Sequence, residues 1–218
     1  YVGKPAEAGT DVFAMDTGVS TSTIPVFDSG FPVDFDFYKE PAGTSDTISG
    51  SRLTGEGYIV VNSNAQASSD SSLVWDSNLG SHEASWFGNT YQAWMWKRHA
   101  GFDVVTATGN GVAGRPQPHS LNAVPEMIWS KSRNNADHWK VYHKGLNGGT
   151  TPEQWFINLN ESSAESQGGT QIWNNTAPTS THFTLGTDDG TNANNWTYIY
   201  MLFASVDGIS KVGSYTGN

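Results

Sequence analysis

The chain contains no cysteine, and none of its 218 residues belongs to a long uninterrupted apolar run. Without cysteine, neither a disulfide framework nor a thiolate metal site can hold the fold, and the sequence carries no trace of its redox compartment. A bilayer-spanning helix needs about 20 consecutive, mostly apolar residues, so we expect no membrane insertion. The stability must come from packing, backbone ladders or assembly with other chains.

Basic residues are also scarce, with 11 Lys and Arg against 21 Asp and Glu and a net charge of −10. This charge repels phosphate backbones and anionic lipid head groups, so nucleic acid and membrane surfaces are poor candidates for a partner. The first ten residues, YVGKPAEAGT, contain no apolar core of a signal peptide and do not start with Met. We therefore interpret the chain as a fragment or a processed product.

What the chain has in abundance is glycine and aromatic residues, with 24 Gly, 9 Trp, 8 Tyr and 10 Phe. Aromatic side chains suit half-buried strands and glycine suits turns, so the composition favours an all-β protein. Short apolar segments separated by Gly, Asn, Asp and Ser clusters predict an antiparallel β-sandwich of the jelly-roll or concanavalin-like kind. The expected strands are Thr23–Phe27, Phe31–Tyr38, Tyr58–Val61, Ser72–Trp75, Thr90–Trp96, Phe102–Ala107, Met127–Lys131, His138–His143, Trp155–Leu159, Gln171–Trp173, His182–Leu185, Thr197–Ala204 and Ser210–Tyr215.

The segment FPVDFDFY, residues 31–38, alternates most clearly. Its phenylalanines and valine point one way, and its aspartates and Tyr38 point the other. We expect one face in the core and one in water.

The two halves of the chain also resemble each other. The block that starts at Tyr91 aligns with the block that starts at Tyr198, an offset of 107 residues, and both blocks end in Thr-Gly-Asn. Four further matches occur upstream in the same order, with offsets that begin at 92, as expected if loops accept insertions while strands keep their order. The pattern predicts two related repeats.

We place the repeats at residues 23–115 and 116–218, and interpret residues 1–22 as a segment from a preceding unit. The Thr-Gly-Asn that ends the chain at residue 218 then stands where a third repeat would follow. We therefore expect the full-length protein to be longer.

Three blocks in the second half carry a resemblance to a known family: WSKSRNNADHWKVYHKGL (129–146), WNNT (173–176) and LFASVDGISKVGSYTGN (202–218). They resemble an uncharacterised repeat domain of virion proteins from tailed bacteriophages, especially marine ones, found in tail-fibre-like polypeptides. The resemblance covers roughly the second repeat, and the first repeat keeps only its framework. It implies a structural role in a virion, outside the cell, in contact with other virion proteins or in a homo-oligomer, with a trimer favoured.

For catalysis, the strongest pair is Asp34 and Asp36, which alternation places about 6.5 to 7 Å apart on one strand face. Glycosidases need carboxyl groups about 5 to 9.5 Å apart, so a polysaccharide depolymerase is one alternative. Acid pairs on solvated strands are common, however, and the E-x-D-x-E strand of laminarinase-like enzymes is absent. His138 and His143 would lie on opposite strand faces, so they cannot share a metal ion. We expect no enzyme activity.

A calcium option exists in the loop GTDDGTNANN, where Asp188, Asp189 and Asn192 offer hard oxygen ligands. The loop lacks EF-hand spacing, and turn chemistry explains the same residues. We therefore expect no cofactor.

Glycan binding is the main functional hypothesis, because sugar sites combine aromatic faces with amide, carboxylate or guanidinium groups. Strand alternation requires Trp86 and Trp139 least, and Arg133, Asn134 and Asn135 lie near Trp139 in the sequence. The alternative for both tryptophans is a cap on the edge of the sandwich.

The segment Thr90–Trp96 is apolar on both faces, which predicts a strand buried between two layers or between a layer and a neighbouring subunit. Lys97, Arg98 and His99 follow it, where the second repeat has Ala, Ser and Val, so any function of this stretch would lie in these three residues.

The resemblance and the candidate residues together predict a virion structural protein that contacts host glycans. The alternatives are a capsid decoration protein without a ligand and a polysaccharide depolymerase.

Overall fold

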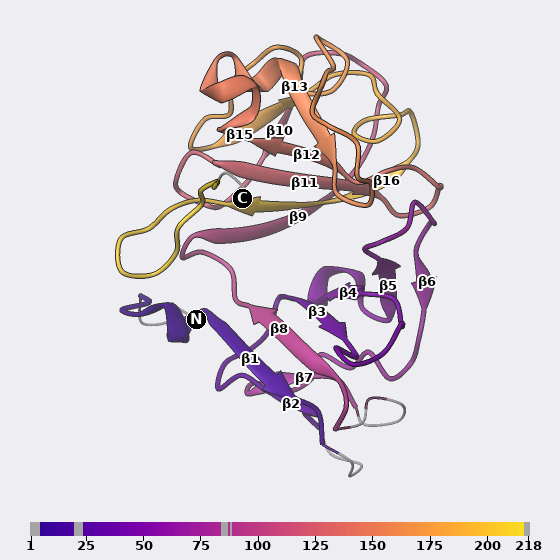
Figure 1. Ribbon diagram of the computed structural model, residues 1–218, viewed down its shortest axis with the longest axis vertical. Helices are drawn as coiled ribbons and strands as arrows, with labels where there is room; N and C mark the ends of the chain where they lie inside the picture. The colour runs from indigo at the N-terminus through magenta and orange to yellow at the C-terminus, as the bar shows by residue number, and fades with distance from the viewer. Residues whose placement is uncertain (1–4, 20–23, 84–86, 88, 216–218) are drawn as a thin grey trace.

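The computed structural model describes residues 5–19, 24–83, 87 and 89–215 and is built from β-strands, with only short 3-10 helices beside them (Figure 1). No helix in these ranges is long and apolar enough to cross a membrane. The 3-10 helices are η1 (Gly9–Asp11), η2 (Arg52–Thr54), η3 (Leu146–Gly149) and η4 (Pro152–Gln154).

Two antiparallel six-stranded sheets dominate the molecule, and each is accompanied by a two-stranded sheet. The first large sheet has the order β1-β8-β3-β4-β5-β6, and the second has the order β9-β16-β11-β12-β13-β14. The small sheets are β2-β7 and β10-β15. The strands of the first half are β1 (Phe13–Thr17), β2 (Phe27–Asp28), β3 (Phe35–Lys39), β4 (Ile48–Ser51), β5 (Gly57–Val60), β6 (Ser68–Ser69), β7 (Gly80–Ser81) and β8 (Gln92–Trp96). Those of the second half are β9 (Phe102–Thr108), β10 (Arg115–Pro118), β11 (Met127–Ser132), β12 (Lys140–His143), β13 (Trp155–Asn158), β14 (Ser166–Gln167), β15 (His182–Leu185) and β16 (Thr197–Phe203).

The predicted repeat is confirmed, because both halves have the same strand order in both of their sheets. The register agrees with the sequence alignment residue by residue. Lys39 lies opposite Gln92 in the first sheet, and Lys131 lies opposite Ile199 in the second. The offset of 92 residues aligns Lys39 with Lys131, and the offset of 107 residues aligns Gln92 with Ile199.

The sheets divide the chain at a different place from the boundary expected at residue 115. The chain leaves the first sheet at the end of β8 and enters the second at β9, so the change falls in the linker 97–101. The segment ahead of residue 23 contains β1, which pairs with β8 in the first sheet. Each large sheet therefore begins with a strand that pairs with its own last strand.

Three apolar clusters form the core. One lies between the first large sheet and β2-β7, and a second lies between the second large sheet and β10-β15. The third contains residues of both large sheets, among them Phe35, Phe102 and Met201. The protein is thus a β-sandwich in which two similar sheets face each other and each is covered on its outer side.

The prediction that Thr90–Trp96 is buried between two layers is confirmed. Ala93 and Met95 belong to the cluster under β2-β7, while Trp96 packs against the cluster between the large sheets. The expectation of a solvent-exposed face on FPVDFDFY is wrong, since Asp36 and Tyr38 are fully buried. Tyr38 belongs to the cluster under β2-β7, and Phe35 belongs to the cluster between the large sheets.

Three other expected strands are absent from the described chain. Ser72–Trp75 and Gln171–Trp173 form turns and irregular backbone, yet Trp75 and Trp173 fill the outer cores of their repeats. Ser210–Tyr215 contains no strand and makes a single bridge, from Ser210 to Val206. Aromatic residues signal burial here but not strand geometry.

Candidate functional site

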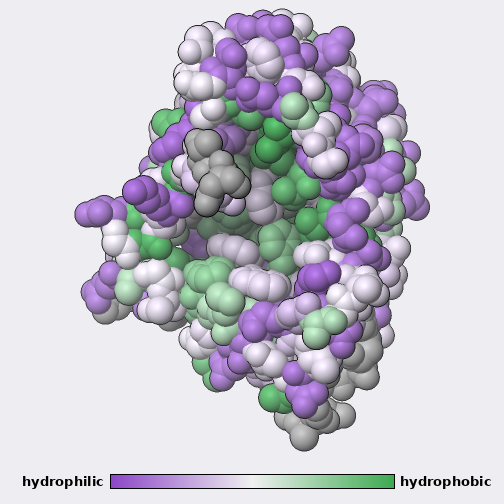
Figure 2. Space-filling model, in the orientation of Figure 1, coloured by the Kyte–Doolittle hydropathy of each residue, from purple (hydrophilic) through white to green (hydrophobic). Residues whose placement is uncertain are grey.

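A cleft of about 680 Å³ opens between the two large sheets. Figure 2 shows this face hollowed, with hydrophobic residues gathered in the hollow. Phe13 and Trp96 come from the first sheet, and Phe102, Trp129 and Phe203 come from the second. The remaining lining includes Met127, Ile209, Val212 and residues 8–10 and 100–101.

The repeat explains why aromatic rings meet in this cleft. Phe13 packs on Trp96 with ring centroids 5.0 Å apart, and Phe102 packs on Phe203 at 5.2 Å, so the contact recurs at matching register positions in both repeats. Phe37 and its counterpart Trp129 stack on each other across the two sheets at 5.5 Å. Each strand with apolar residues on both faces therefore contributes one face to the outer core of its repeat and the other face to the aromatic lining between the large sheets.

Polar residues are few in the lining of the cleft. They are Thr10, Ser210 and the exposed Lys211, and Ser210 donates its hydroxyl to the carbonyl of Ala204 at 2.6 Å. Gly101 has a φ of 79°, and a Cβ at this position would lie 2.0 Å from Ser210 Oγ, so the turn requires glycine. The cleft can therefore accept an apolar surface or the flat face of a ring, and it offers few hydrogen-bonding groups.

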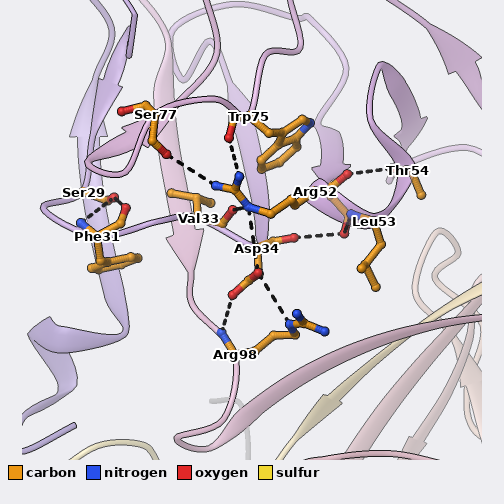
Figure 3. Close-up of polar contacts among 11 residues, drawn as sticks. Ser29, Phe31, Val33, Asp34, Arg52, Leu53, Thr54, Trp75, Ser77 and Arg98 are labelled. Carbon is orange, nitrogen blue, oxygen red and sulfur yellow. Dashed lines mark hydrogen bonds and ion pairs between the residues drawn. The ribbon is translucent and has the colours of Figure 1, made fainter. Parts of the chain in front are cut away.

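Arg98 has a structural partner outside the cleft. Its backbone N–H donates to Asp34 Oδ2 at 2.8 Å, and its side-chain Nε lies 3.5 Å from Asp34 Oδ1 (Figure 3). Arg52 approaches the same carboxylate at 4.0 Å and donates to the carbonyls of Val33 and Trp75. We call Asp34 with Arg52 and Arg98 the acid clamp, because it fastens the linker after β8 to the start of β3.

The second repeat contains a matching clamp. Glu126 precedes β11 as Asp34 precedes β3, and it accepts hydrogen bonds from the backbone N–H and the hydroxyl of Ser205. Lys144, which follows β12, lies 2.9 Å from Glu126. Burial alone would raise the pKa of Glu126, but the hydrogen bonds from Ser205 and Lys144 outweigh it and hold that pKa below its ordinary value. The clamp therefore belongs to the fold.

The hypothetical hydrolase pair does not form a reactive site. Asp34 is held in the clamp, and Asp36 is fully buried, with its Oδ2 2.8 Å from both Ser81 Oγ and His82 Nε2. Neither carboxylate lines the cleft. A polysaccharide cannot reach a fully buried carboxyl group, so this pair lacks the access that glycoside hydrolysis requires.

The structure corrects the interpretation of Trp139 as a glycan platform. This side chain is fully buried between the large sheets, and its Nε1 donates to the carbonyl of Val60 at 3.3 Å. Asn134 is exposed, but its side-chain oxygen accepts the N–H of Thr197 at 2.8 Å, and Arg133 and Asn135 are half-buried beside it. Trp86, the other proposed platform, lies outside the described residues.

The remaining candidates serve the turns. Lys97 donates its backbone N–H to Val12 O, and the exposed His99 has a φ of 94°. In the possible calcium loop, Asn192 is fully buried, and its side chain bonds to Gly186 O, Asn110 and Arg115. Asp188 Oδ1 accepts the N–H of Gly190, a turn contact. Within the part of the chain that the structure describes, no group of three or more His, Cys, Asp or Glu side chains could hold a metal ion.

Sequence reasoning thus missed the residues of the cleft, because it assigned them to buried layers. The sequence did contain one indication of the cleft. Gln92–Trp96 and its counterpart in the second repeat are both apolar on two faces, and two such strands imply two inner faces that pack on each other. What the sequence did not contain was the placement of one large sheet on the other, which creates the cleft.

The fold and cleft define a class, a tandem β-sandwich with an aromatic cleft between its two repeats. The chain belongs to the family described as a domain of unknown function (DUF7483), whose model matches residues 38–218 and so covers the second repeat and most of the first. No curated protein and no solved structure matches the chain.

Proposed function

We propose that this chain is a structural module of a phage virion, part of a tail fibre or similar surface appendage, and that it contacts a host-surface glycan through the cleft between its large sheets. The observation that carries the proposal is the cleft, in which both repeats contribute aromatic rings and Ser210, Thr10 and Lys211 add polar groups. Aromatic rings pack against the C–H faces of sugars, and neighbouring polar groups form hydrogen bonds with the sugar hydroxyls.

The virion assignment is supported by the resemblance of the three blocks at residues 129–146, 173–176 and 202–218. A face-to-face pair of covered sheets also suits a rigid spacer, because each sheet is buried on both sides.

A glycan array probed with the folded chain tests the proposal. We expect Phe13→Leu to weaken binding about tenfold, because a branched aliphatic side chain loses the flat stacking face. Lys211→Ala should weaken it less, and Leu79→Ala, at an exposed position outside the cleft, should leave it unchanged. A folded chain that binds no glycan contradicts the proposal.

Two other outcomes identify the alternatives. Binding to capsids without any glycan signal would favour a capsid decoration protein. Reducing ends released from host polysaccharide by the folded chain would favour a depolymerase with a site other than the pair of Asp34 and Asp36.

A further inference from the structure

The two large sheets end in four edge strands: β1 and β6 in the first, β9 and β14 in the second. β6 and β14 contain two residues each. Very short edges offer few free backbone groups to another chain. β1 and β9 are longer and occupy equivalent positions, so they allow a direct comparison.

The outer edge of β9 is closed by its own surroundings. Hydrogen bonds from Ala204 N to Gly101 O and from Gly109 N to Trp196 O show that the odd-numbered residues of β9 face β16. The even-numbered residues therefore direct their N–H and C=O groups outward. Three of these groups are occupied: Val104 N–H by Asp103 Oδ1, Phe102 C=O by His99 N–H, and Thr108 C=O by Arg115 Nη1.

The outer edge of β1 is open. Lys97 N donates to Val12 O and Gly18 N to Tyr91 O, so the even-numbered residues face β8. Phe13, Met15 and Thr17 direct their backbone groups outward. In the part of the chain that the structure describes, the backbone groups of these three residues make no hydrogen bond.

Two side chains add to this difference. Ala14 stands at the register position of Asp103, so β1 lacks the carboxylate that caps the edge of β9. Met15, an apolar side chain at the middle of the strand, is 56% exposed. An open edge with a central apolar residue is a template for strand pairing. Figure 1 shows β1 at the outer border of its sheet.

We propose that β1 pairs with β1 of a second copy of this chain, antiparallel and around a two-fold axis at Met15. In this register Phe13 lies opposite Thr17 and Met15 opposite Met15, and all three present their outward backbone groups to one another. Asp16 lies opposite Ala14, so no like charges face each other. The strand is complementary to itself, which is why a second copy is the partner.

Pairing at β1 joins the two first sheets into one continuous sheet. Phe13 also lines the cleft, so the two clefts lie near the same two-fold axis. A dimer would then present two sites together, which raises the avidity for a repeating ligand without a new contact. The dimer itself does not depend on any ligand.

Sedimentation velocity of the full chain over a wide concentration range tests the pairing. We expect a monomer–dimer equilibrium, weakened more than about tenfold by Met15→Lys, which places two like charges opposite each other. Met15→Pro should weaken it as well, because the N–H that proline removes points outward and is not needed by β8. Leu79→Lys, at a position 57% exposed, is the matched control and should dimerise normally.

Cross-linking tests the register. Because the chain has no cysteine, Met15→Cys introduces a single thiol. Paired residues of this kind have Cα atoms about 5.5 Å apart, within the range of a disulfide. Oxidation should yield covalent dimers of Met15→Cys and not of Leu79→Cys. A chain that stays monomeric, or a dimer that Met15→Lys leaves intact, overturns the proposal.

Discussion

At the scale of single residues, the buried pair of Asp36 and His82 is a difference between the two repeats. Ile128 occupies the register position of Asp36 in the second repeat and is equally buried. The same framework thus accepts a carboxylate with partners or a plain apolar side chain. A buried polar pair is weak evidence for stability, because the cost of removing both groups from water offsets the attraction between them.

We expect His82→Leu to lower the free energy of unfolding by about 1 to 3 kcal/mol, since it removes a hydrogen-bond partner of the buried Asp36 carboxyl group. The double variant Asp36→Ile with His82→Leu should lose much less stability, because it removes both polar groups. It also gives the first repeat the isoleucine that the second repeat has at residue 128. Urea unfolding measures both. A double variant as unstable as the single one would contradict this explanation.

Lys131 gives a pH-dependent effect at the same scale. It is fully buried and donates to the carbonyls of Ser132 and Asn64 at 3.0 and 3.3 Å. Burial lowers its pKa from 10.5 to about 8, while Asp137 acts in the opposite direction. Between these two values the unfolded chain binds more protons than the folded one, so the Lys131 contribution to stability rises with pH, by at most about 1.4 kcal/mol per pH unit.

We expect Lys131→Met to remove this part of the pH dependence and to leave the stability at neutral pH equal or higher. Unfolding in urea, compared between neutral pH and pH 10, measures the difference from the unmodified chain. Lys211→Met, at an exposed position, should keep the original slope.

At the scale of elements, the acid clamp links two strands that are far apart in the sequence. We expect Asp34→Asn and Glu126→Gln each to cost about 1 to 2 kcal/mol, because each keeps a hydrogen-bond acceptor but loses the charge, and the cations are partly exposed. Thermal unfolding measures the loss. Equal stability of both variants with the unmodified chain would show that the clamp does not hold the linkers.

The sequence predicted the elements unevenly. Strands rich in aromatic and apolar residues, such as those at Gln92–Trp96 and Trp155–Asn158, were identified near their observed bounds. β4, with the sequence ISGS, and β10, with RPQP, were missed because Gly, Ser and Pro resemble turn residues. Their strand geometry comes from pairing with neighbours, which a local pattern does not contain.

At the scale of the whole molecule, the two repeats share one inner core. Phe102 is 2% exposed and contacts Phe35 of the first sheet and Phe203 of the second. We expect Phe102→Ala to cost about 3 to 5 kcal/mol and to lower a single calorimetric transition, because neither sheet keeps its inner face covered alone. Val112→Ala, at an exposed site, should change stability by less than about 0.5 kcal/mol. Two transitions, of which only one shifts, would contradict a shared core.

The internal repeat could be predicted because paired strands keep their order and register, and sequence offsets record both. The cleft could not, since its walls are ordinary core residues along each strand and become a site only through the placement of one sheet on the other. Trp139 shows the same limit in reverse: its neighbours in the sequence are polar, yet it fills the space between the sheets.

The last consequence concerns mechanical load. Gly9 lies against Ile209, so close that a Cβ on Gly9 would be 2.9 Å from the carbonyl oxygen of Ile209. The two ends of the described unit therefore meet beside the cleft. Tension applied to the polypeptide at these two points would load this contact first, and a non-bonded contact resists little force. The two segments beside the cleft would therefore separate before the strand ladders of the large sheets break.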